Sequence, residues 1–211
     1  DHRDLHSFPT RRSSDLHLSR GSLLHLLDID HQGTLTASEY YHLLESFEAY
    51  SDPFHKKSSF LLKLLGDSGL FSVHDPENLV PVLDYHMMRV LLRSGGIAIH
   101  RQEDHTMLQA KMIFPGEPAV REAGIDAMKR IAQQSGVDVL RLNDIFYMLG
   151  RSCCLEPPLC VAGACSKNPC SLTLTLHLQS HDYCLLDRVC VGKTDESFRS
   201  LWQPVTETHY Y

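Results

Sequence analysis

Residues 149–190 read LGRSCCLEPPLCVAGACSKNPCSLTLTLHLQSHDYCLLDRVC, and they contain all seven cysteines of this 211-residue chain. A secreted disulfide framework spreads its cysteines so that they tie distant segments together, and it usually has an even number of them. Seven thiols in one stretch therefore favour a metal site, with a local disulfide-bonded knot as the alternative. The thiols are Cys153, Cys154, Cys160, Cys165, Cys170, Cys184 and Cys190.

The spacing of these thiols suits a shared centre. Cys153 and Cys160 are separated by six residues, and Cys184 and Cys190 by five. Prolines and glycine between the thiols let one loop turn around a single centre. Thiolates bind soft or borderline metals, and four of them complete either an iron–sulfur cluster or a zinc site.

The composition limits the class of protein. The chain has 20 Lys+Arg and 26 Asp+Glu, a formal net charge of −6, and is 43% hydrophobic and 22% charged. These values exclude a disordered tail, a collagen-like repeat and a disulfide-scaffold toxin. No apolar run approaches the roughly 18–20 residues of a membrane helix, so we expect no membrane partner and a cytoplasmic location. The negative net charge gives no overall attraction to nucleic acid.

Residues 1–16, DHRDLHSFPTRRSSDL, show no apolar periodicity and no secretory apolar core. The string resembles a translated sequencing adapter. We therefore expect the natural sequence to start near His17, inside a longer protein.

Apolar residues recur at helical spacing along most of the chain, which predicts a mainly α-helical fold. Strand-like alternation is confined to residues 96–100 and 172–178. The predicted helices cover residues 23–27, 40–47, 56–65, 118–136 and 142–149, together with one that Asp84 caps and that runs to Gly95.

Residues 28–39, DIDHQGTLTASE, resemble the twelve-residue calcium loop of an EF-hand. Gly33 allows the sharp turn at position six, and Leu35 at position eight would pair with a partner loop, although no second such loop is visible downstream. The alternative is a helix-turn-helix in which Thr36 and Glu39 form a capping box. The predicted calcium ligands are Asp28, Asp30, Gln32, Thr34, Thr36 and Glu39.

Residues 82–90, VLDYHMMRV, resemble the start of the helix that bears the catalytic carboxylate in helix-hairpin-helix DNA glycosylases related to endonuclease III. The cysteine tail has its features in the same order as in that family: a helix ends just before Cys153, and Cys184 and Cys190 are the last two cysteines. The resemblance covers about residues 50–190. It implies a helical bundle of the glycosylase type with a cysteine-rich loop that binds a [4Fe–4S] cluster, and it implies nucleic acid as a partner.

The chain departs from this family in two places. Residues 52–59 replace the family's Leu-Pro-Gly-Val-Gly hairpin, whose backbone amides hold a DNA phosphate, so ordinary duplex binding is expected to be weaker. Extra cysteines and an insertion over residues 171–183 leave the ligand set open. The resemblance implies Cys153 or Cys154, one of Cys160, Cys165 and Cys170, and then Cys184 and Cys190.

The same resemblance implies catalytic roles. Lys57 or Lys56 would supply the amine that attacks the sugar carbon, and Asp84 the carboxylate that stabilises the developing positive charge. The structural alternatives are a solvated lysine pair and a helix N-cap. Four arginines could contact phosphates if they share one face, and these are Arg89, Arg93, Arg141 and Arg151.

Four regions are predicted: an adapter at 1–16, an EF-hand-like helix-loop-helix at 17–50, a helical glycosylase-like domain at 51–152 and a metal-binding tail at 153–211. The predicted function is recognition or excision of a modified base in nucleic acid by an iron–sulfur protein. The alternative is a non-catalytic calcium-binding or zinc-stabilised module. No oligomeric state is predicted.

Overall fold

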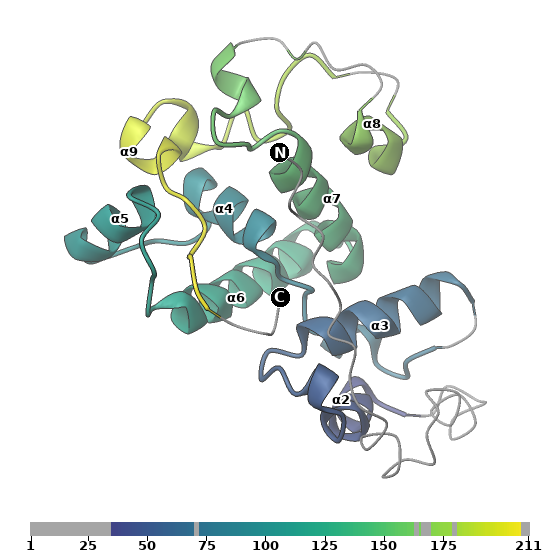
Figure 1. Cartoon of the computed structure of the whole chain (residues 1–211). Helices are drawn as coiled ribbons and strands as arrows, with labels where there is room; N and C mark the ends of the chain where they lie inside the picture. The colour runs from purple at the N-terminus through teal and green to yellow at the C-terminus, as the bar shows by residue number, and fades with distance from the viewer. Residues whose placement is uncertain (1–34, 70–71, 163–164, 166–169, 179–180, 208–211) are drawn as a thin grey trace, which may run out of the picture. The chain divides into compact units, whose positions relative to one another are not determined.

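The computed structural model describes residues 35–69, 72–162, 165, 170–178 and 181–207. The fold is mainly helical, as the apolar periodicity predicted (Figure 1). The chain divides into two compact units, Asp1–Asn78 and Leu79–Tyr211.

The described part of the first unit contains α2 (Ala37–Glu45), η2 (Glu48–Tyr50), α3 (Lys56–Asp67) and η3 (Pro76–Asn78). Helix α2 begins at a capping box: the Thr36 side chain accepts from the Glu39 amide, and the Glu39 carboxylate accepts from the Thr36 amide at 2.8 Å. These bonds satisfy amides that the first helical turn leaves unpaired. The capping box that the sequence offered as the alternative to a calcium loop is therefore present, while the helix and turn before it lie outside the described residues.

Tyr41 joins α2 to the start of α3. Its hydroxyl shares a 2.7 Å hydrogen bond with Ser59 Oγ, and its ring stacks on His55 with centroids 4.4 Å apart. His55 has a left-handed backbone, with φ of 55°, and immediately precedes α3. The predicted helix at 56–65 forms and continues through Gly66 to Asp67.

The second unit has three packed helices as its core, α4 (Tyr85–Ser94), α6 (Glu117–Ser135) and α7 (Val139–Ser152) (Figure 1). Asp84 caps α4 through a 2.9 Å bond from the Met87 amide, and Gly95 ends the helix at φ of 84°. Gly136 ends α6 in the same way. The predicted start of α4 and the predicted ends of α4 and α6 are therefore confirmed. The sequence could predict them because each depends on a local capping interaction.

Five shorter helical elements complete the described part of this unit. They are α5 (Gln102–Gln109), η4 (Leu159–Ala162), α8 (Ser171–Leu176), η5 (Val191–Lys193) and α9 (Glu196–Arg199). Phe114 N donates to Val205 O at 2.8 Å beside an isolated bridge between Ile113 and Val205, so the end of the described chain lies against the segment before α6.

The two predicted strands are wrong. Residues 96–100 form no strand, and residues 172–178 contain most of α8. The alternation of Leu and Thr fits a strand, but Cys170 and Thr173 form a capping box that starts a helix, and Leu172 is fully buried in it. Residues 102–109, which are not among the predicted helices, form α5. Its first turn carries Glu103 and Asp104, which suit a helix N-terminus.

No helix in the described ranges is both long and apolar enough to cross a membrane. The boundary between the two units falls inside the range predicted as one helical domain, 51–152, so Lys56 and Lys57 belong to the first unit and Asp84 to the second.

Candidate metal centre

Helix α7 delivers the first thiols. Cys153 follows its last residue, and the amides of Cys153 and Cys154 donate to Leu149 O at 3.0 and 2.7 Å. The end of α7 packs backbone to backbone on α4 at Gly150. A Cβ at Gly150 would lie 2.7 Å from the His86 carbonyl carbon and 2.8 Å from the His86 Cβ, so the packing leaves no room for a side chain.

Two buried arginines of α4 hold the start of the cysteine tail. Arg89 and Arg93 are each only 3% exposed. Arg89 donates from Nε to Cys154 O and from Nη2 to Gly150 O, both at 2.7 Å. Charge-assisted bonds of this kind are worth about 1.5–3 kcal/mol each, so they fix the backbone at the first thiols.

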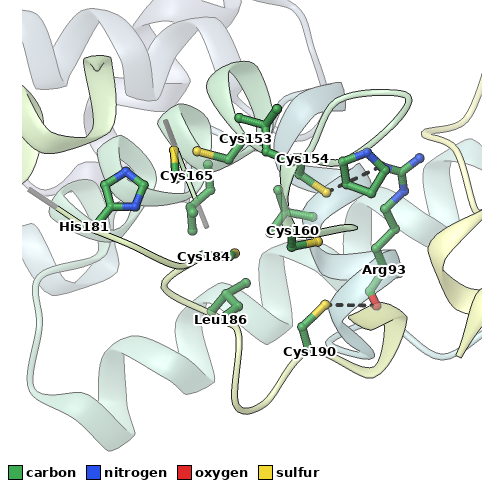
Figure 2. A pocket seen from close by; sticks show the side chains of 13 residues that line it. Arg93, Cys153, Cys154, Cys160, Cys165, His181, Cys184, Leu186 and Cys190 are labelled. Atoms are coloured by element: carbon green, nitrogen blue, oxygen red, sulfur yellow. Dashed lines mark hydrogen bonds between the residues drawn. The ribbon is translucent and has the colours of Figure 1, made fainter. Parts of the chain in front are cut away.

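Arg93 contacts both ends of the tail. Its Nη1 donates to Leu155 O at 2.5 Å and to Cys154 Sγ at 3.6 Å, and its Nε donates to Leu201 O at 2.8 Å. The Cys190 thiol donates to Arg93 O at 3.6 Å. Figure 2 shows the contacts of Cys154 and Cys190 with this one residue of α4.

Six of the seven thiols line one pocket with a cavity of about 40 Å³. This space exceeds the ~10–15 Å³ that one water requires. Its remaining walls are largely apolar and include Val90, Leu149 and Leu186, and His181 also lines it. The six thiols are Cys153, Cys154, Cys160, Cys165, Cys184 and Cys190.

Four of these thiols form an electrostatically linked group. Burial is the main cause that raises the pKa of the Cys184 thiol to about 11, and three neighbouring thiols act in the same direction. They are Cys160, Cys154 and Cys190. Burial likewise raises the pKa of Cys160 and Cys190. A bound cation would reverse this preference, because metal ligation requires the thiolate.

His181 lines the same pocket. In the view of Figure 2, Cys165 is drawn beside His181, and Cys153 lies between Cys165 and Cys154.

Cys170 is the one cysteine that does not line the pocket, but its Sγ lies 3.4 Å from His181 Nε2. Burial raises the pKa of Cys170, but hydrogen bonds with Thr173 and His181 outweigh it and lower the pKa to about 7.

Single-ion spacing is absent from the described residues: no three His, Cys, Asp or Glu side chains there are gathered as they would be around one metal ion. The structure instead brings six thiols around one cavity, and Cys154, Cys160 and Cys190 are the three that act on the pKa of Cys184. The sequence did not single out His181, although it stands three residues before Cys184.

The structure describes all three predicted catalytic residues. Asp84 is 7% exposed and accepts from the Met87 amide, which is the N-cap role that sequence reasoning gave as its alternative. Lys56 begins α3, and its amide donates to Asp52 Oδ2 at 3.2 Å. Lys57 follows it with a half-buried side chain.

The predicted phosphate contacts of Arg89 and Arg93 are wrong, because both guanidinium groups are buried against carbonyls of the tail. The sequence could not predict that these arginines bind backbone carbonyls, because the carbonyls lie far away along the chain. Arg141 and Arg151 are exposed. Arg141 donates to Thr175 O at 2.7 Å and Arg151 to Tyr147 Oη at 3.1 Å.

The predicted calcium ligands Asp28, Asp30, Gln32 and Thr34 lie outside the described residues. Thr36 and Glu39 form the capping box of α2. Leu35 O accepts from the His74 amide at 3.0 Å, so the residue expected to face a partner loop does have a backbone partner.

No family model, curated protein or solved structure matches the chain.

Proposed function

We propose that the second unit holds a [4Fe–4S] cluster on Cys154, Cys160, Cys184 and Cys190, and that the protein recognises or excises a modified base in nucleic acid. The observation that carries the cluster is the convergence of six thiols on one cavity, of which Cys154, Cys160 and Cys190 act on the pKa of Cys184. The nucleic-acid function rests on the resemblance of residues 82–90 and of the cysteine order to the endonuclease III family.

The spacing of the thiols favours a cluster over one zinc ion. Each ligand of a four-iron cluster binds a different iron atom, so its sulfurs stand further apart than those around one ion. The four thiols line a common pocket without the close grouping that a single ion needs. A cluster there would join both ends of the tail to α4, to which Arg89 and Arg93 already fasten it.

Colour and metal analysis distinguish the two metals. Protein purified without oxygen should be brown, should absorb broadly in the blue and should contain iron and sulfide. A colourless protein with stoichiometric zinc and no iron would overturn the cluster proposal.

Asp84 is suited to combine a structural and a catalytic role. Capping uses one carboxylate oxygen, Oδ1, while the charge remains able to stabilise a cation that develops as a base departs. Asp84→Asn separates the roles, because asparagine caps a helix as well as aspartate does but carries no charge. The variant should keep the melting temperature of the wild type and lose base-excision activity. Equal activity would leave Asp84 as a cap alone.

The amine is tested by trapping. If Lys57 or Lys56 attacks the sugar, its amine forms an imine with the sugar aldehyde, and borohydride reduces that imine to a stable protein–DNA adduct. The adduct should disappear in either Lys57→Gln or Lys56→Gln and persist in Lys63→Gln, which changes a lysine of the same helix. An adduct retained in both first-turn variants would contradict the assignment.

A calcium-responsive module is the second candidate function, favoured by the hydrogen bond from the His74 amide to Leu35 O. Counting seven residues back from His74 gives the segment 67–78, DSGLFSVHDPEN, which lacks the glycine at position six and the glutamate at position twelve of an EF-hand loop. The support for a partner segment is therefore the hydrogen bond and not the sequence. Asp75 in this segment accepts from the Ala37 amide at 2.6 Å.

Calcium titration tests this candidate. Calcium should raise the melting temperature of the wild type and should leave Glu39→Gln unchanged, because glutamine preserves the capping box but cannot close the ion's shell with two carboxylate oxygens. A wild type that shows neither a thermal shift nor binding heat at millimolar calcium would exclude it.

A further inference from the structure

Cys170 and His181 form a contact that the proposed cluster does not use. Cys170 Sγ lies 3.4 Å from His181 Nε2, and Cys170 does not line the pocket of the other six thiols. Neither residue is one of the four ligands proposed for the cluster. A thiol within hydrogen-bond reach of an imidazole is the arrangement that activates a cysteine as a nucleophile.

We propose that Cys170 is an oxidative modification site, a thiolate that attacks hydrogen peroxide and becomes a sulfenic acid, with His181 as the proton donor. The site goes beyond the proposed function and does not depend on it, because it needs neither the cluster nor nucleic acid.

His181 is held in the orientation that this role requires. Its Nδ1 lies 3.1 Å from Tyr183 O, and since a carbonyl only accepts, Nδ1 carries a proton and donates it. Nε2 is therefore the nitrogen that exchanges a proton with Cys170. A nucleophile paired with a base that a third group orients is the arrangement of activated nucleophiles in enzymes.

The surroundings of Cys170 stabilise its thiolate. The Thr173 amide donates to Cys170 Sγ at 3.5 Å, and a hydrogen bond to the charged form of a group favours that form. Although burial raises the pKa of Cys170, its hydrogen bonds with Thr173 and His181 lower the pKa to about 7. The contact with Cys170 raises the pKa of His181, and the charge of Asp182 acts in the same direction. Thiolate and imidazolium therefore form together.

The exposure of the pair limits the size of the reagent. Cys170 is 8% exposed and His181 is half-buried. Such a thiol cannot accept a polypeptide or another bulky electrophile without opening of the fold. Hydrogen peroxide is little larger than water, and its oxidation of thiolates depends on thiolate character and access.

The reaction balances with the groups present. The Cys170 thiolate attacks one peroxide oxygen, so that an S–O bond forms and the O–O bond breaks. The sulfur loses two electrons, and the peroxide gains them. The second oxygen leaves as hydroxide and takes the proton of His181 Nε2, which gives water. The products are a sulfenic acid, water and a neutral imidazole.

Three variants test the site. His181→Gln removes the imidazole. Cys170→Ser keeps the start of α8, because serine is a preferred N-cap residue, and it shows that the label in this part of the tail belongs to Cys170. His177→Asn is the matched control: His177 is exposed in the same insertion, and asparagine tolerates its left-handed backbone, with φ of 54°.

The measurement is the rate at which hydrogen peroxide oxidises Cys170 at pH 7 in protein purified without oxygen. Catalase stops the reaction, the protein is unfolded in urea with dimedone, and tandem mass spectrometry assigns the dimedone-labelled cysteine. A second sample is unfolded in urea before peroxide is added. This comparison of native and unfolded wild type does not depend on any variant folding.

The expected loss of rate in His181→Gln follows from two effects. At pH 7 a thiol with a pKa of about 7 is half ionised, whereas an ordinary thiol is roughly 3% ionised. The weaker nucleophilicity of the less basic thiolate offsets roughly 5-fold of this difference. Loss of the proton donor then adds to it, because general acid catalysis contributes about 10²–10⁴-fold.

Native wild type and His177→Asn should therefore form the sulfenic acid at equal rates, at least ~10-fold faster than His181→Gln and than the unfolded chain. Cys170→Ser should leave no label at residue 170 and no label of comparable rate at Cys184. Cys170 that is oxidised no faster in the native wild type than in urea, or at the same rate in His181→Gln, would overturn the proposal. Iron content does not enter these outcomes, so failure of this site and failure of the cluster are distinguishable.

Discussion

Gly150→Ala tests whether the close packing of α7 on α4 positions the first thiols. The new Cβ would lie 2.7 and 2.8 Å from the His86 carbonyl carbon and Cβ, and it would also collide with the His86 carbonyl oxygen. Normal carbon–carbon contacts are about 3.5–4.0 Å, so the two helices must separate by roughly 1 Å. Overpacking costs about 1–3 kcal/mol, and the helix propensity of alanine returns up to ~1 kcal/mol of it.

The expected net loss in unfolding free energy is about 1–2 kcal/mol, which corresponds to a fall in melting temperature of roughly 3–10 °C for a unit of this size. Iron content should fall with it, because Cys153 and Cys154 move with the end of α7. The measurements are a thermal melt and iron analysis of the same sample.

Gly66→Ala is the control for this substitution. Gly66 also lies in a helix, α3, but a Cβ there meets nothing within 4 Å. Alanine at Gly66 should stabilise the first unit by about 0.5–1 kcal/mol and leave iron content unchanged. A Gly150→Ala protein as stable and as iron-rich as the wild type would refute the steric argument.

Three further outcomes follow from the site. Arg93→Met keeps an apolar stem but removes the donors to Leu155 O and Leu201 O, and we expect a loss of about 3–5 kcal/mol by urea unfolding, since buried carbonyls are left without donors. Asp84→Ala removes the N-cap of α4 and should cost about 0.5–2 kcal/mol, whereas Asp84→Asn should cost almost nothing in the same assay. In metal-free protein, burial raises the pKa of the Cys184 thiol to about 11 in the folded state. The folded state therefore binds this proton more tightly than the unfolded state does, and the stability that this provides is complete below the usual thiol pKa and is lost as the pH rises through 11. Unfolding free energy should therefore fall with alkaline pH more steeply in the wild type than in Cys184→Ala, and equal slopes would contradict this.

Local signals in the sequence predicted much of the helical fold. Asp84, Gly95 and Gly136 act through bonds to near neighbours, so their positions alone indicate where α4 and α6 begin or end. The strand predicted at 172–178 failed for a related reason. Its period-two pattern is real, but the capping box at Cys170 is also local and favours a helix there.

The site itself depends on contacts that no local pattern contains. Arg89 and Arg93 resemble exposed cations in sequence, yet they bind carbonyls that lie 61 to 108 residues away. Clustering of cysteines predicted a shared centre, while the contact of Cys170 with His181 and the effect of three thiols on the pKa of Cys184 follow only from the folded tail.

The most direct test of the account is iron per chain in protein purified without oxygen, compared between Cys184→Ala and Cys165→Ala. Cys184 is one of the four thiols proposed to hold the cluster, and Cys165 lines the same pocket but is not one of the four. The account predicts four iron atoms per chain in the wild type and in Cys165→Ala, and a colourless, iron-poor Cys184→Ala protein. A folded wild type without iron, or iron that survives in Cys184→Ala and is lost in Cys165→Ala, would contradict it.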